Sequence, residues 1–338
     1  MSLSSPSTPA SPRSSARAAA LGPLRGQRLL VTGSSGFIGG HLVDCALAAG
    51  AKVTALTRAG SEPGRLHRHA GLEIVQVDDL RDAAALADRV AHVAPDIVLH
   101  LAALADWRQD PSLTCKMVDA HVVGTANLLE AARAAAVTRV VLFGSAGEYG
   151  DHGQPLGEER REKPLDPYSA TKLAATNLGL MYHRSFGLPC TVVRPFVVYG
   201  PGESAHRLIP SIFATAAAGG GPVDFTAGTQ RRDFVYVDDV AEGALRAALV
   251  PAAAGEVLNL GTGIATSVRD MASRAIEVSG NRVVPHFGAR PMRVGEPLCL
   301  VADMAKTERI LGWRPRVSLR EGLQDFWERA APKGEAGL

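Results

Sequence analysis

Short apolar runs rich in β-branched residues alternate along the chain with alanine-rich stretches. The runs typical of buried β-strands are Arg28–Thr32, Lys52–Leu56, Glu73–Val77, Ile97–Leu101, Arg139–Phe143 and Thr191–Arg194. The stretches between them have the length and composition of helices. This alternation predicts βαβ units with right-handed crossovers, and so a parallel sheet covered by helices on both faces. The predicted fold class is α/β, with ligands bound at the carboxyl ends of the strands.

The strict alternation ends after about Tyr199, where glycine- and proline-rich segments interrupt mixed helices and strands. We predict a dinucleotide-binding domain over residues 27–195 and a smaller α/β substrate lobe over residues 196–330. The segments Val235–Val240 and Val257–Leu260 look like buried strands or strand–helix joints. The chain is therefore expected to re-enter the first domain at about residues 232–262.

The first 26 residues are rich in Ser, Pro, Ala and Arg and contain no acidic residue. An organelle-targeting helix also has this composition, but Pro6, Pro9 and Pro12 oppose a helix. We expect residues 1–26 to form a disordered tail.

The overall composition narrows the classes of function. Hydrophobic residues make up 46% of the chain and the formal net charge is only +2, which disfavours a nucleic-acid-binding surface. Charges, prolines or glycines interrupt every apolar stretch before the roughly 18 residues that a membrane helix needs. The cysteines Cys45, Cys115, Cys190 and Cys299 include no CxxC pair, so we expect reduced thiols, a cytoplasmic location and no metal site.

A glycine-rich loop, Thr32–Gly40, joins the first predicted strand to an apolar helical stretch. Glycines in this context allow a tight turn and a close approach to a pyrophosphate, which the free N–H groups of a helix N-terminus attract. An ordinary glycine turn is the alternative, but the position after the first strand favours a Rossmann-type dinucleotide site.

The second strand ends in Arg58, where an NAD-specific site usually carries an acidic residue. A guanidinium can pair with a 2′-phosphate, so Arg58 favours NADP(H), although a solvated Arg58 with bound NAD(H) is also consistent. Asp79 and Leu80 follow the third strand, and Leu101, Ala102 and Ala103 close the fourth. We expect all of them to line the cofactor groove.

Tyr168 and Lys172 stand four residues apart at the start of a predicted helix, and Ser145 follows the strand that ends at Phe143. The spacing places the phenol and the ammonium group on one helix face, where the cation can lower the pKa of the phenol. Ser145 can hydrogen-bond the same substrate oxygen. Each residue alone is common on surfaces, but together on a dinucleotide fold they indicate a hydride-transfer site with Tyr168 as acid/base.

From Arg28 to about Trp327 the chain resembles the extended short-chain dehydrogenase/reductase family, which contains nucleotide-sugar epimerases, dehydratases and reductases. The matching motifs are the Gly33, Gly36, Gly39 loop, His100–Ala103, Ser145 with Tyr149-Gly150, Tyr168 with Lys172, Arg194-Pro195-Phe196, Tyr199–Gly202, Arg232-Asp233-Phe234, Asn259–Gly263 and Leu311-Gly312-Trp313.

The resemblance implies roles for individual residues. The catalytic residues would be Ser145, Tyr168 and Lys172. The cofactor-binding residues would be Gly33, Ser35, Gly36, Phe37, Ile38, Gly39, Arg58, Asp79, Leu80, Leu101, Ala102, Ala103, Tyr168, Lys172 and Pro195. The substrate-binding residues would be Ser145, Glu148, Val197, Arg232 and Arg293, with the two arginines on a diphosphate. The family also implies a homodimer, formed through helices that carry Val122, Leu128, Leu129, Leu173 and Leu178.

Departures from the family pattern narrow the expected reaction. Ala146 and Gly147 stand where sugar dehydratases carry an acidic residue, so dehydration is disfavoured. Three further residues differ from those usual in the family: Glu148, His121 and Val197. Glu148 has two possible roles, a helix-side hydrogen bond or substrate recognition. For His121 we favour the interpretation as a packed core histidine.

Our leading prediction is NADPH-dependent reduction of a nucleotide-linked 4-keto-6-deoxyhexose, as in deoxysugar biosynthesis. The alternative is a redox-neutral NAD-dependent 4-epimerase of a nucleotide sugar. A non-catalytic dinucleotide sensor is a remote third reading, because such proteins commonly lose the Tyr or the Lys.

Overall fold

A computed structural model of the chain describes residues 20–330, except 61–65, 67–68, 70–71, 154 and 294. Its centre is a seven-stranded sheet in the order β11-β6-β5-β4-β1-β2-β3, in which all neighbouring strands pair in parallel. The strands are β1 (Arg28–Thr32), β2 (Lys52–Arg58), β3 (Glu73–Val77), β4 (Ile97–His100), β5 (Arg139–Phe143), β6 (Cys190–Pro195) and β11 (Val257–Leu260). The α/β fold class is confirmed, and the predicted strand boundaries agree or shift by one or two residues.

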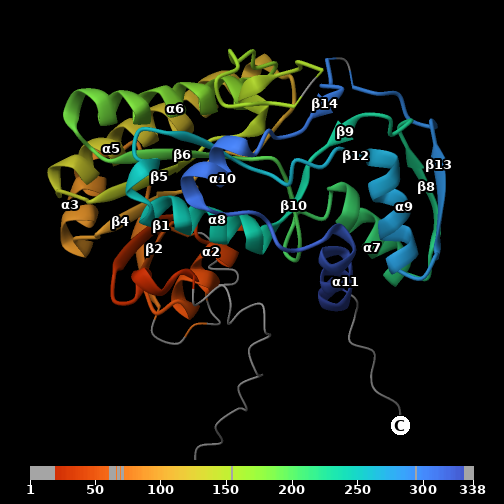
Figure 1. The fold of residues 1–338 in the computed structure, drawn as a ribbon, viewed down its shortest axis with the longest axis horizontal. Helices are drawn as coiled ribbons and strands as arrows, with labels where there is room; N and C mark the ends of the chain where they lie inside the picture. Colours follow the sequence, from red (N-terminus) through yellow and green to blue (C-terminus); the bar gives the residue numbers. More distant parts are fainter. Residues whose placement is uncertain are drawn as a thin grey trace, which may run out of the picture.

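Helices cover both faces of this sheet (Figure 1). They are α2 (Phe37–Ala48), α3 (Ala83–Val93), α4 (Thr114–Met117), the π-helical turn η4 (Val118–Val123), α5 (Gly124–Ala134), α6 (Pro167–Phe186), α8 (Val237–Leu249) and α10 (Ala305–Leu311), with short 3-10 turns η1 (Gly22–Leu24), η3 (Pro111–Leu113), η5 (Ala146–Tyr149) and η6 (Pro251–Ala253). Side chains of β1 alternate between the two faces, as the period of a strand requires. Leu29 and Val31 pack with Leu42 of α2, whereas Leu30 packs with Leu128 of α5.

The remaining elements gather at one end of the molecule, at the right of Figure 1. They are β7 (Val197–Tyr199), α7 (Leu208–Ala217), β8 (Gly221–Phe225), β9 (Arg231–Arg232), β10 (Phe234–Tyr236), β12 (Thr266–Ser267), α9 (Val268–Val278), β13 (Val283–Phe287), β14 (Cys299–Leu300) and α11 (Leu319–Ala330). An apolar cluster of their own, including Phe213, Met271 and Phe326, holds them together. Between these elements the chain returns to the large sheet through α8 and β11.

Two details differ from the sequence-based expectations. Leu21 and Leu24, which the composition assigns to a disordered tail, are fully buried in the core beside α2, while residues 1–19 lie outside the described residues. Leu128 and Leu129 are also fully buried within this chain, so a subunit interface on these helices would use their other side chains. Val122, Leu173 and Leu178 keep partial exposure. Among the described residues, no helix has the length and apolar character needed to cross a membrane.

Candidate active site

The glycine loop after β1 packs so closely against neighbouring backbone that two of its positions have no room for a side chain. Gly33 has a φ of +66°, and a Cβ there would lie 2.6 Å from the Ala102 nitrogen. A Cβ on Gly39 would lie 2.2 Å from the carbonyl oxygen of Gly33. Helix α2 starts directly after the loop, and its N-cap residue Gly36 contributes no side chain. The first N–H groups of the helix are therefore open to an anion, and the loop fits a dinucleotide diphosphate.

The other residues predicted for the cofactor lie at the same edge of the sheet. They comprise Ser35 in the loop, Phe37 and Ile38 in the first turn of α2, Arg58 at the end of β2, Asp79 and Leu80 after β3, Leu101–Ala103 after β4, and Pro195 at the end of β6. The Ala102 N–H donates to Oγ1 of Thr32 at 3.1 Å, which holds the segment after β4 against the end of β1.

Arg58 is exposed, and a second cation lies in the same region. Arg81 pairs with Asp79 at 2.6 Å and with Asp119 at 3.0 Å. The hydrogen bonds from Arg81 hold the pKa of Asp79 below its usual value, and the charge of Arg58 acts in the same direction. Sequence reasoning missed Arg81, although it follows Asp79 by only two positions.

Tyr168 and Lys172 lie in the first turns of α6, which Pro167 and the capping side chain of Asp166 start. Both residues are buried, and the Ser145 side chain, near the Tyr168 phenol, acts to lower its pKa. Burial lowers the pKa of Lys172 to about 8, and the Glu148 carboxylate partly opposes this shift. Burial raises the pKa of Tyr168, as does the charge of Glu148. In the protein alone the phenol therefore stays protonated, and the expected lowering of its pKa by Lys172 is not among the main influences on it.

Glu148 is completely buried, and its charge acts on both Tyr168 and Lys172. Its Oε1 accepts from Ser145 N at 2.8 Å, and its Oε2 accepts from Thr176 Oγ1 at 3.0 Å and from Arg194 Nε at 2.9 Å. Arg194 is equally buried. Protein groups therefore occupy both carboxylate oxygens, which favours the helix-side hydrogen bond over substrate recognition for Glu148: it caps the turn η5 and fixes the backbone of Ser145.

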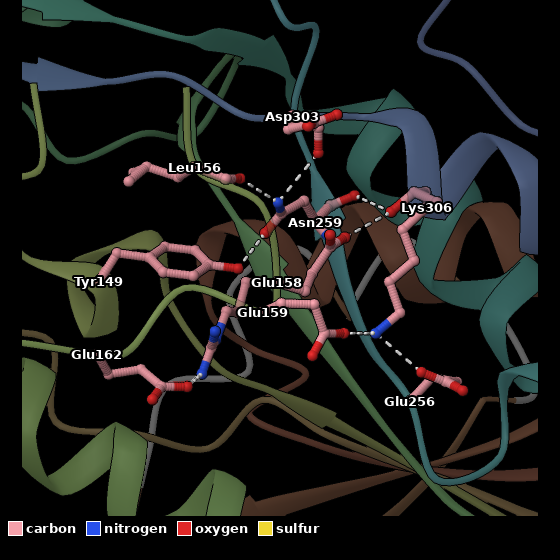
Figure 2. A network of polar contacts seen from close by, with 11 residues as sticks. Tyr149, Leu156, Glu158, Glu159, Glu162, Glu256, Asn259, Asp303 and Lys306 are labelled. Atoms are coloured by element: carbon pink, nitrogen blue, oxygen red, sulfur yellow. Dashed lines mark hydrogen bonds and ion pairs between the residues drawn. The ribbon is translucent and has the colours of Figure 1, made fainter. Parts of the chain in front are cut away.

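A network of hydrogen bonds centred on Asn259 links to Tyr149, the residue after Glu148 (Figure 2). Asn259, at the end of β11, accepts from the Tyr149 hydroxyl at 2.8 Å and donates to the carbonyl oxygens of Leu156 and Asp303 at 2.7 and 3.1 Å. Glu158 accepts from the Asn259 N–H at 2.9 Å. Tyr149 and Asn259, which carry two of the family motifs, therefore connect η5, the loop before α6 and the segment before α10.

The predicted diphosphate arginines occupy different environments. Arg232 is buried and pairs with Glu296 at 2.9 Å, while Gln230 Nε2 donates to the same Glu296 oxygen at 3.2 Å. Burial lowers the pKa of Arg232, and the Glu296 charge opposes this. Arg293 is exposed, three residues before Glu296. Val197, also predicted to meet substrate, is half-buried at the start of β7.

Trp107 and Arg207 extend the site in a way that sequence reasoning missed. The Trp107 ring lies 4.9 Å from the Tyr168 ring, and the Arg207 guanidinium lies 4.9 Å from the centre of Trp107. Arg207 pairs with Glu203, whose pKa burial raises to about 7. Trp107 stands in an irregular loop without periodicity, so only its large apolar side chain among charged neighbours could have signalled a role. Within the described ranges, no group of His, Cys, Asp and Glu side chains could hold a metal ion.

Comparison with known proteins places this site in a family. Residues 29–261 match the model of the NAD dependent epimerase/dehydratase family. A UDP-glucose 4-epimerase of Mycolicibacterium smegmatis is 35% identical over 308 residues, which are 88% of this chain and 96% of the relative. A UDP-glucuronate 4-epimerase of Thermodesulfobacterium geofontis is 31% identical over 87% of this chain and 93% of its own length.

Solved structures agree with this assignment. The Thermus thermophilus UDP-glucose 4-epimerase, in complex with NAD, superposes with a TM-score of 0.81 at 29% identity and covers 91% of this chain and 99% of its own. MoeE5 in complex with UDP-glucuronic acid and NAD gives 0.78 at 34% identity, over 89% and 98% of the two chains. This chain is therefore an enzyme of the NAD dependent epimerase/dehydratase family, within the extended short-chain dehydrogenases/reductases.

Proposed function

We propose that the protein is an NAD-dependent 4-epimerase of a UDP-hexose. The observation that carries the proposal is the pair of buried residues Tyr168 and Lys172, with the half-buried Ser145 near the phenol, on a fold whose glycine loop fits a dinucleotide. The relatives named UDP-glucose and UDP-glucuronate 4-epimerases support the epimerase over the reductase that the sequence favoured.

The side chains can move the proton that this reaction requires. A bound NAD would supply the hydride acceptor and donor that inversion at C4 of the sugar requires. Tyr168 takes the C4 hydroxyl proton during oxidation and gives it back during reduction, so atoms and charge balance over the cycle. Ser145 would orient the same substrate oxygen by a hydrogen bond, and Lys172 supplies a positive charge one helical turn from Tyr168. The glycine loop would hold the cofactor diphosphate, and Arg232 with Arg293 would hold that of the sugar nucleotide.

The proposal is tested with purified enzyme, NAD⁺ and UDP-glucose, with formation of UDP-galactose followed by chromatography. Tyr168→Phe should reduce turnover by a factor of about 10² or more, because it removes the acid/base, while NAD⁺ binding persists. Tyr182→Phe on the same helix is the matched control and should keep wild-type turnover. Turnover by Tyr168→Phe at the wild-type rate would refute the acid/base assignment.

Reduction with NADPH is the second candidate, since Arg58 replaces the usual acidic residue. Mass spectrometry of the dinucleotide released by denaturing fresh protein separates the two reactions. Retained NAD⁺ supports a redox-neutral cycle, whereas an empty protein that prefers NADPH supports the reductase. Arg58→Ala should weaken NADP⁺ binding selectively only if the guanidinium contacts a 2′-phosphate.

We also propose that the enzyme acts in the cytoplasm, in agreement with the free cysteines Cys115, Cys190 and Cys299, and that it works as a homodimer. Val118 and Val123 on η4 are exposed apolar residues that could join Val122, Leu173 and Leu178 in a subunit interface. Light scattering of the purified protein, with Val123→Lys as the perturbing variant, tests the dimer.

A further inference from the structure

His121 joins two segments that carry parts of the site. It lies in η4 and is only 1% exposed. Its Nε2 accepts from the Leu104 N–H at 2.9 Å, in the loop after β4. Its Nδ1 lies 2.8 Å from Oγ1 of Thr171, and the Thr171 hydroxyl donates to the Pro167 carbonyl at 2.7 Å in the first turn of α6. One side chain therefore connects the loop after β4 with the helix that carries Tyr168.

The direction of these bonds fixes the proton on the ring. A backbone N–H can only donate, so Nε2 must be the acceptor. In a neutral imidazole the proton then lies on Nδ1, which donates to Thr171. Burial lowers the pKa of His121 to about 4, and the nearby charge of Lys172 acts in the same direction, so the ring is neutral at pH 7.

His121 also contacts the catalytic ring. The imidazole meets the Tyr168 phenol edge-on, with centroids 5.5 Å apart and an interplanar angle of 89°. Trp107, three residues after Leu104 in the same loop, lies 4.9 Å from the same phenol. The bond from Leu104 to His121 therefore helps to place both aromatic neighbours of Tyr168.

We infer that His121 is a positioning residue of this enzyme: through Nδ1–H it fixes the start of α6 and the Tyr168 phenol, and through Nε2 it fixes the loop after β4 against the cofactor site. The inference rests on the proposed function for the role of Tyr168.

Two substitutions of His121 each keep one of its two hydrogen bonds and remove the other. In His121→Asn the amide nitrogen takes the place of Nδ1 and keeps the Thr171 bond, whereas in His121→Gln the amide oxygen takes the place of Nε2 and keeps the Leu104 bond. We expect His121→Gln to lower kcat about tenfold with KM for UDP-glucose within about twofold, since the loss of one buried hydrogen bond has that effect on a rate. We expect His121→Asn to release NAD⁺ about tenfold faster.

Thr171→Val removes the acceptor of Nδ1–H and should lower kcat as His121→Gln does, with no further loss in the double variant. Thr191→Val is the matched control, because Thr191 is a fully buried threonine whose hydroxyl donates to the Ala253 carbonyl away from the site. Wild-type kcat in both His121→Gln and Thr171→Val, or an equal loss in Thr191→Val, would overturn the inference.

A readout independent of turnover separates this inference from the proposed function. In ¹⁵N-histidine NMR spectra at pH 7, assigned with His121→Asn, the His121 ring should be the neutral Nδ1–H tautomer. An Nε2–H tautomer or an imidazolium would overturn the inference even in an active enzyme. If the wild type converts no UDP-hexose, the proposed function fails, while the tautomer and the NAD⁺ release rate still decide the role of His121.

Discussion

Replacing Glu148 by Gln should destabilise the enzyme strongly, because it breaks a fully buried ion pair. Glu148 and Arg194 both have no exposed side-chain surface, and their closest approach is 2.7 Å. Removal of one partner leaves the other charge buried and only partly compensated, which typically costs about 3–5 kcal/mol. Glu162, 29% exposed and 2.8 Å from Arg194, retains part of the compensation, so we expect about 3 kcal/mol.

The assay is urea denaturation at pH 7, followed by circular dichroism, on wild type, Glu148→Gln, and the double variant Glu148→Leu with Arg194→Met. The double variant should recover most of the lost stability, because apolar side chains of similar volume replace both charges. A loss below about 1 kcal/mol in Glu148→Gln would refute this reasoning, since that is the range of exposed pairs.

The same variant distinguishes a structural from a substrate-contacting Glu148. A substrate contact predicts a higher KM for the nucleotide sugar at unchanged stability. The observed cap on Ser145 predicts a lower kcat together with lower stability, because the Ser145 backbone loses an acceptor. A raised KM in a fully stable variant would restore the sequence-based assignment.

Other predictions follow from the same structure. Gly39→Ala should abolish NAD⁺ retention, because its Cβ would lie 2.2 Å from the Gly33 carbonyl oxygen and distort the glycine loop. Gly22→Ala is the control, because a Cβ there has no atom within 4 Å. Retained NAD⁺ in Gly39→Ala would contradict the assignment of this loop to the cofactor diphosphate. Burial lowers the pKa of His100 to about 3 and that of His121 to about 4. The unfolded chain therefore binds more protons below pH 6.5, and stability falls by about 2 kcal/mol per histidine between pH 7 and 5. Thermal melts at both values should show a smaller loss for His121→Asn; an equal loss would contradict this.

The central sheet was predictable because its strands, apart from the largely exposed edge strand β3, are buried on both faces and carry continuous apolar runs. Arg28–Thr32 and Glu73–Val77 match the predicted boundaries residue for residue. The glycine loop and the spacing of Tyr168 and Lys172 are equally local signals, because backbone conformation and helix periodicity determine them.

Contacts between residues far apart in the sequence could not be predicted from local sequence patterns. Glu148 resembles a substrate-facing carboxylate until Arg194, 46 positions away, is placed beside it. Trp107 and Arg207 belong to irregular segments of different lobes and meet only in the folded chain. Leu21 and Leu24 are too few to form a periodic pattern, and their burial depends on the neighbouring core.

The charges around Lys172 show why Glu148 matters beyond the ion pair. Lys172, His100 and His121 are buried basic groups near one another, and the charge of Lys172 lowers the pKa of both histidines. Burial brings the pKa of Lys172 to about 8, and the carboxylate of Glu148 is the group that opposes this shift. Without that charge the pKa of Lys172 falls further, and the ammonium form then requires a lower pH. The kcat that Glu148→Gln loses should therefore recover partly as the pH falls from 7 to about 6, a range in which the wild type keeps Lys172 largely protonated because its pKa is about 8. A pH–rate profile parallel to that of the wild type would show that Glu148 acts on Ser145 alone.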